Sequence, residues 1–171
     1  MGQDTARPYG LRLGTSALTV WRLEREKHFP TWNTAEGAFL VGGRWSSPGQ
    51  RVIYASLDPA TTILEVAVHK CFDVLDSVPH RLLEIELGTT PIKVLLPSEV
   101  PNPHWLSPGA VSPNQQKFGD ALLAASPLAL VPSTVSKHSW NLLINVASAS
   151  DQLALKNHER FALDPRLTTI R

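Results

Sequence analysis

Short runs of apolar residues, separated by turn-forming residues, predict several strands and two clear helices. The segment 17–25 alternates β-branched and aromatic residues with polar ones, which predicts a strand carrying Arg22 on one face. Segments 51–56, 81–87 and 91–97 predict further strands, and the last two are apolar enough to be buried in a sheet. A strand over 128–135, broken at Pro132, and apolar segments over 138–148 and 160–167 follow. This pattern predicts a single α+β domain.

The first predicted helix follows the strand at 51–56. Asp58 is a suitable N-cap, and Pro59 suits the first helical position. Apolar residues then recur at helical spacing, at Ile63, Leu64, Ala67, Val68 and Phe72. A helix that buries Leu64 and Val68 would put Glu65 near the edge of its buried face. Segment 115–126 predicts the second helix.

Three segments have the composition of loops or tails. Residues 1–14 predict a flexible tail, with the domain proper over 15–171. Residues 30–50 contain several glycines and prolines, and a loop of this length is usually functional or disordered. Residues 97–113 contain five prolines, which predict an ordered connection or a mobile flap.

Composition narrows the class of function. The chain has 171 residues, 43% of them apolar, which suits one core, and its formal net charge of +1 argues against a nucleic-acid or membrane-surface partner. The single cysteine, Cys71, excludes an internal disulfide, and we expect it to be a small buried hydrophobic residue. No signal peptide or membrane-spanning run is evident, so we expect a soluble cytoplasmic protein. The His residues lack helical pair spacing, and no metal site is expected.

Three polar residues are candidates for chemistry. Tyr54 follows Arg44 by ten residues and Glu65 follows Tyr54 by eleven, on a predicted loop, strand and helix. By residue type alone they are more often a surface cation, a half-buried aromatic and a solvated carboxylate. The pair Gly42 and Gly43 favours a site, because it lets the backbone approach a ligand beside the Arg44 guanidinium.

The string GGRWSSPGQRVIYAS, followed by TTILEVAVH, resembles the RES-domain family of bacterial toxins. Arg44, Glu65 and Ser133 match the arginine, glutamate and serine after which the family is named. Weaker matches extend the resemblance from about Trp21 to Leu167, namely Trp21–Arg22, Gly119–Asp120, Asn141 with Asn145, and FALDPRL. The chain departs from the family at VASAS after Asn145, where proline and histidine are common, and at His28 and Phe29, where a tyrosine is usual.

This resemblance implies an ADP-ribosyltransferase-like fold, with a split mixed β-sheet and flanking helices around a cleft for NAD⁺. It implies a toxin that destroys NAD⁺ by breaking the nicotinamide–ribose bond, with NAD⁺ as substrate and no resident cofactor. The implied catalytic residues are Arg44, Tyr54 and Glu65, and the implied substrate-binding residues are Arg22, His28, Ser133 and Asn141. Glu65 would stabilise the oxocarbenium-like transition state, while Arg22 and Arg44 would bind the pyrophosphate.

Several alternatives stay open at this stage. The acceptor of ADP-ribose is water, phosphate or a protein, and the last would make the chain a mono-ADP-ribosyltransferase. An inactive NAD⁺-binding or interaction module and an RNA-cleaving toxin are the other classes, and the near-neutral charge disfavours the latter. The resemblance also implies an Xre-type antitoxin as partner, in a homodimer or a toxin–antitoxin hetero-oligomer.

Overall fold

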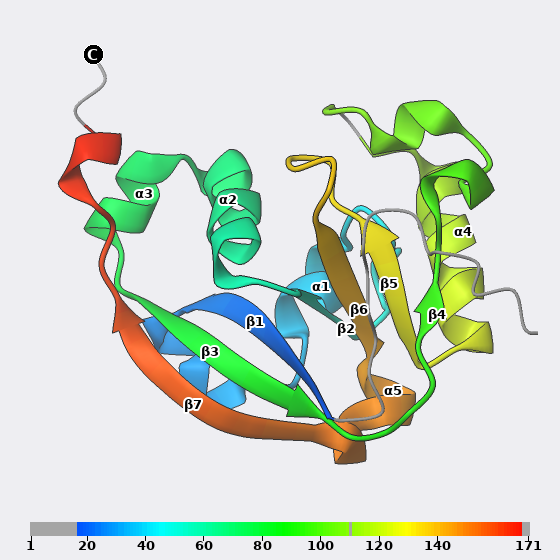
Figure 1. Cartoon of the computed structure of the whole chain (residues 1–171), viewed down its shortest axis with the longest axis horizontal. Helices are drawn as coiled ribbons and strands as arrows, with labels where there is room; N and C mark the ends of the chain where they lie inside the picture. The colour runs from blue at the N-terminus through cyan, green and yellow to red at the C-terminus, as the bar shows by residue number, and fades with distance from the viewer. Residues whose placement is uncertain (1–16, 110, 169–171) are drawn as a thin grey trace, which may run out of the picture.

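The computed structural model describes residues 17–109 and 111–168. Within these residues, seven strands form one mixed sheet in the order β4-β5-β6-β2-β1-β3-β7, and helices flank it (Figure 1). The α+β class with a mixed sheet and flanking helices is confirmed. The tail expected over 1–14 lies outside the described residues, so the predicted boundary between tail and domain stays a prediction.

The elements have the following bounds. The strands are β1 (Leu18–Arg25), β2 (Val52–Ser56), β3 (His80–Leu87), β4 (Lys93–Val94), β5 (Leu128–Pro132), β6 (Trp140–Asn145) and β7 (Leu153–Phe161). The α-helices are α1 (Glu36–Val41), α2 (Pro59–Lys70), α3 (Phe72–Ser77), α4 (Pro113–Ala125) and α5 (Val146–Ala149). Short 3₁₀ helices cover Glu26–Thr31, Pro97–Glu99, Pro103–Leu106, Ser150–Gln152 and Pro165–Leu167.

The sheet is split between β1 and β2. These two strands pair antiparallel at one register position, Trp21 with Ser56, whereas β1 pairs with β3 along its whole length from Leu18 to Arg25. Figure 1 shows the two halves diverging, with α2 against β1 and with α4 flanking β4 and β5. The predicted split is therefore confirmed, and it leaves space between the halves.

Apolar strand residues explain why the sheet forms. Strand β5 is buried at every position, and β6 is buried at four of its six. The main core gathers Val20, Ile53, Leu83, Leu130 and Ile144 from both halves of the sheet, each fully buried. The two halves thus share one core below the split and are held as one body.

Several predicted elements differ in the structure. The strand predicted over 91–97 pairs through Lys93–Val94, parallel to β5, because prolines flank it on both sides. The described residues of the proline-rich segment include two 3₁₀ helices, Pro97–Glu99 and Pro103–Leu106. Strand β7 was not predicted, because most of its residues are exposed and polar.

Helix α2 begins as predicted but buries a different face. The Asp58 carboxylate accepts a hydrogen bond from the Thr61 backbone N–H at 2.8 Å, as an N-cap should. The prediction that Leu64 and Val68 are buried is wrong, since they are 37% and 58% exposed. The buried residues of the helix are Thr61, Thr62 and Ala67, and the Thr62 hydroxyl donates to the Trp21 carbonyl at 2.8 Å. The helix therefore lies close against β1.

Cys71 lies at the junction between α2 and α3. The prediction that it is buried is wrong, because the thiol is exposed. Its φ of 58° is in the left-handed region, which turns the chain sharply from one helix into the next. In the described part of the chain, no helix has the length and apolar character needed to cross a membrane.

Candidate functional site

A pocket of about 380 Å³ occupies the split between the two halves of the sheet. Its size is within the range of about 300–1,000 Å³ that is typical of small-molecule sites. It is lined by residues of β1, α1, the loop before β2, β2 itself, α2 and β6. Among the lining residues are Arg22, Glu24, Arg44, Tyr54, Glu65, His69, Lys70 and Asn141.

Glu65 is brought to the pocket by α2 and is held from the opposite half of the sheet. The Ser133 hydroxyl donates to Glu65 Oε1 at 2.8 Å, and the Asn141 side-chain Nδ2 donates to the same oxygen. Ser133 follows β5 directly, and Asn141 is on β6. Three residues that are far apart in sequence therefore meet at one carboxylate, and its orientation is fixed.

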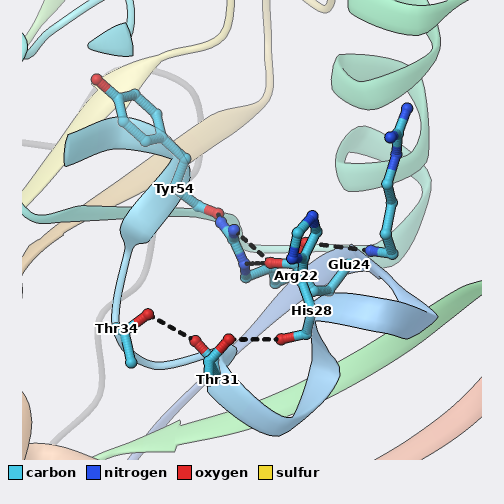
Figure 2. Close-up of polar contacts among 7 residues, drawn as sticks. Arg22, Glu24, His28, Thr31, Thr34 and Tyr54 are labelled. Carbon is cyan, nitrogen blue, oxygen red and sulfur yellow. Dashed lines mark hydrogen bonds and ion pairs between the residues drawn. The ribbon is translucent and has the colours of Figure 1, made fainter. Parts of the chain in front are cut away.

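Arg22 joins the two sides of the split (Figure 2). Its Nη1 donates to the Tyr54 carbonyl at 2.9 Å, while its Nε and Nη2 donate to Glu24 Oε2 at 3.0 and 2.6 Å. Burial raises the pKa of Glu24, but the charge and hydrogen bonds of Arg22 outweigh it and hold that pKa below its ordinary value. The Arg22 guanidinium is thus paired within the protein at the wall of the pocket.

Arg44 is positioned by the proline-rich connection. Its Nη1 donates to the Trp105 carbonyl at 3.1 Å, and its Nη2 donates to the Gly109 carbonyl at 3.3 Å. Burial lowers the pKa of Arg44, while the nearby Glu65 and Tyr54 raise it. The guanidinium therefore lines the pocket and holds the connection beside it.

Tyr54 holds the loop that carries Arg44. Its hydroxyl accepts from the Trp45 backbone N–H at 3.1 Å and lies 2.9 Å from the Ser46 hydroxyl. Burial raises its pKa to about 12, so the phenol is protonated at neutral pH. A Cβ on Gly43 would lie 2.5 Å from the Tyr54 hydroxyl, so glycine is required for this close approach. The Tyr54 ring is on the pocket wall, and its hydroxyl positions the loop.

Helix α4 fixes the same loop from the other side. The Gln116 side chain donates to the Gly43 carbonyl at 3.0 Å, and the Ser47 backbone N–H donates to Asp120 Oδ1 at 3.0 Å. A Cβ on Gly119 would lie 2.0 Å from the Trp45 carbonyl oxygen. The Gly119–Asp120 pair noted in the sequence therefore serves this helix–loop contact.

His28 is not brought to the pocket. It is exposed on the 3₁₀ helix after β1, and its carbonyl accepts a hydrogen bond from the Thr31 hydroxyl at 3.3 Å (Figure 2). The neighbouring Phe29 ring packs against His158, with ring centroids 4.5 Å apart, and beneath the Arg81 guanidinium. Of the predicted site residues, Arg22, Arg44, Tyr54, Glu65 and Asn141 line the pocket, and Ser133 reaches it through Glu65.

Sequence reasoning missed Lys70, Glu24 and Ser56, all of which line the pocket. The Lys70 ammonium makes no hydrogen bond or ion pair with the described residues, in contrast to the guanidinium groups of Arg22 and Arg44. Burial and the Arg25 charge lower the pKa of Lys70, and together they outweigh the attraction of the Glu24 carboxylate, which raises it. Only its place in the last turn of the predicted helix, five residues after Glu65, could have indicated its location.

The charges suggest what the pocket can do chemically. Unpaired Lys70, together with Arg22 and Arg44, can attract an anionic ligand such as a phosphate ester. The Glu65 carboxylate can stabilise positive charge that develops on a bound sugar. Over the described residues, no cluster of three His, Cys, Asp or Glu side chains is placed to bind a metal ion.

Comparison with known proteins identifies the family. The family model described as RES domain matches residues 19–164. The protein named Toxin Res of Pseudomonas putida is 36% identical over 155 residues, covering 88% of this chain and 99% of that protein. The Prs ADP-ribosylating toxin of a Sphingobium species is 32% identical over 138 residues, covering 77% of this chain and 83% of that protein.

A solved structure agrees with this assignment at the level of the fold. The crystal structure of the M. tuberculosis MbcT–MbcA toxin–antitoxin complex matches with a TM-score of 0.72 and 19% sequence identity. The match covers 86% of this chain and 86% of that chain. The resemblance seen in the sequence is confirmed, and the chain belongs to the RES-domain family.

Proposed function

We propose that this protein is the toxin of a toxin–antitoxin pair, and that it consumes NAD⁺ by breaking the nicotinamide–ribose bond in the pocket at the split. The observation that carries the proposal is the Glu65 carboxylate, held by Ser133 and Asn141 on the wall of a pocket that also contains three cationic side chains. The toxin role is supported by the curated relative named Toxin Res.

The residues suit each part of the substrate. In the reaction, the bond between ribose C1′ and the nicotinamide nitrogen breaks, and its electron pair leaves with neutral nicotinamide. Positive charge then develops on C1′ and the ring oxygen, which a fixed carboxylate stabilises without reorganisation. Lys70 and Arg44 are suited to the pyrophosphate, and the Tyr54 ring offers a face for the nicotinamide.

The acceptor of the ADP-ribose group defines the second candidate. The Sphingobium relative is named an ADP-ribosylating toxin, which favours transfer to a protein side chain in place of hydrolysis or phosphorolysis. Both candidates share the step that releases nicotinamide. The products therefore distinguish them: free ADP-ribose from water, ADP-ribose 1″-phosphate from phosphate, or a mass increase on a target protein.

We further propose that an antitoxin binds this protein, since the matching solved structure is a toxin–antitoxin complex. The Xre type of that antitoxin and the homodimeric or hetero-oligomeric state remain expectations from the family resemblance. Because cellular NAD⁺ is the proposed substrate, we place the action of the protein in the cytoplasm.

The test compares the wild type with Glu65→Gln, which keeps the size of the side chain and removes its charge. Bacterial NAD⁺ content and growth are measured after induction, together with nicotinamide release by the purified proteins. We expect Glu65→Gln to slow nicotinamide release by about 10²-fold or more. The matched control is Glu86→Gln, which removes an exposed carboxylate on β3 that pairs with Lys156. Growth arrest by the wild type at constant NAD⁺ would refute the proposal.

A further inference from the structure

Ser56 is a buried serine at the junction of the split sheet. It is the last residue of β2, it is 3% exposed, and it is the register partner of Trp21 on β1 and of Asn141 on β6. Its hydroxyl donates to the Asn141 side-chain Oδ1 at 2.8 Å. Ser56 therefore touches one of the two side chains that hold Glu65.

The direction of this hydrogen bond fixes the Asn141 carboxamide. A carboxamide accepts at its oxygen and donates at its nitrogen, so its two ends are not equivalent. Because Ser56 donates to Oδ1, the Nδ2 end is directed toward Glu65 Oε1. The reversed carboxamide would place Oδ1 against the carboxylate oxygen and lose the donor, which is electrostatically unfavourable.

A second chain of hydrogen bonds ends on the same carboxylate oxygen. The Ser133 hydroxyl accepts from the backbone N–H groups of Val135 and Ser136 at 3.2 and 3.1 Å, so its own proton is left for Glu65 Oε1. Among the described residues, Glu65 Oε2 receives no hydrogen bond. The carboxylate is thus anchored through one oxygen, and the other is available to a ligand.

We propose that Ser56 is a positioning residue for the reaction: by orienting the Asn141 carboxamide, it anchors Glu65 Oε1 and presents Oε2 to the ribose. This inference rests on the proposed function. The positioning role differs from a purely structural role, in which the Ser56 hydroxyl would only supply a hydrogen bond to the buried Asn141 oxygen and stabilise the sheet.

The first experiment is a double-mutant cycle on nicotinamide release, with Ser56→Ala, Asn141→Ala and the combined variant. We expect Ser56→Ala to lower kcat about tenfold while KM stays within about twofold, because the anchored carboxylate acts mainly in the transition state. In the Asn141→Ala background, the same change should have no further effect, since Ser56 acts through Asn141. Equal effects of Ser56→Ala in both backgrounds would overturn the proposal.

Two controls separate positioning from folding. Ser56→Thr keeps the hydroxyl and should keep kcat within about threefold of the wild type. Ser126→Ala removes a hydroxyl that bonds the Leu128 carbonyl away from the pocket, and it should leave kcat unchanged. Melting temperatures of all variants show whether each is folded. A well-folded Ser56→Ala protein with wild-type kcat would also overturn the proposal.

A second readout does not depend on NAD⁺ consumption. The side-chain amide signals of Asn141 are identified in NMR spectra by their loss in Asn141→Ala, and their hydrogen exchange is measured. We expect exchange to accelerate by about tenfold in Ser56→Ala, because the carboxamide loses its fixed orientation. Unchanged exchange in Ser56→Ala would refute the positioning role. Accelerated exchange in Ser56→Ala, together with a wild type that releases no nicotinamide, would refute the proposed function alone.

Discussion

Replacing Gly119 by alanine tests the contact between α4 and the loop that carries Arg44. In the middle of a helix, this change normally stabilises a protein by about 0.5–1 kcal/mol. Here the new Cβ would lie 2.0 Å from the Trp45 carbonyl oxygen and 2.6 Å from its carbonyl carbon. Since an ordinary carbon–oxygen contact is about 3.3 Å, the loop or the helix has to move by more than about 1 Å.

The expected cost follows from what this movement breaks. Overpacking costs typically about 1–3 kcal/mol. The hydrogen bonds from Ser47 to Asp120 and from Gln116 to Gly43 bridge the same interface, and each contributes about 1 kcal/mol. After the gain in helix propensity is subtracted, we expect the free energy of unfolding to fall by about 3 kcal/mol and Tm by roughly 6–12 °C.

The assay is urea unfolding followed by far-UV circular dichroism, with the slope m compared between variants. The matched control is Gly37→Ala on α1, where nothing lies within 4 Å of the new Cβ. We expect that control to be neutral or more stable by up to about 1 kcal/mol. A Gly119→Ala protein that unfolds at the wild-type urea concentration would refute the close packing of α4 on the loop.

Two further predictions concern charge. Lys70→Ala should raise KM for NAD⁺ about tenfold with little change in kcat, because it removes an unpaired cation from the pocket. The control Lys27→Ala, which changes an exposed lysine outside the pocket, should leave KM unchanged. A loss confined to kcat in Lys70→Ala would contradict the assignment of Lys70 to pyrophosphate binding. Burial lowers the pKa of His80 below 6.5, and the charges of Lys70 and Arg25 add to this shift. The neutral His80 imidazole therefore contributes its full share of stability above about pH 6.5, and this share is lost as the pH falls through the folded-state pKa. The urea midpoint should therefore fall between about pH 7.5 and 5.5 in the wild type and change less in His80→Phe, and parallel pH curves would contradict this reasoning.

Strands β2 and β5 were predictable because their runs of apolar residues are buried in the sheet. The segment of β6 was recognised only as apolar, since Asn141 and Asn145 interrupt its apolar run. Strand β7 was not, since it lies at an edge and exposes most of its side chains, which removes the apolar pattern. On α2, periodicity indicated the wrong buried face. Ile63, Val66 and Ala67 of the helix pack with the apolar cluster that contains Leu23 and Leu82. Leu64 and Val68, by contrast, lie toward solvent.

The site was predictable only in part, because some of its contacts join residues that are far apart in the sequence. Arg44, Tyr54 and Glu65 could be found because glycines and a family motif surround them. The contact from Ser56 to Asn141 joins residues 85 positions apart, and it exists only because β2 and β6 pair in register. The free cation at Lys70 is equally invisible in the sequence, since nothing there shows that Arg22 is paired with Glu24 and Lys70 is not.

The two carbonyls held by Arg44 make its mutagenesis ambiguous unless the variants are chosen with care. One guanidinium lines the pocket and also ties down Trp105 and Gly109, so an Arg44→Ala phenotype mixes loss of an anion contact with release of the proline-rich connection. Arg44→Lys retains the positive charge, but its single ammonium lacks the planar fork that reaches both carbonyls. Comparing the two variants divides the contribution of Arg44 between electrostatic attraction and mechanical restraint of the adjoining chain.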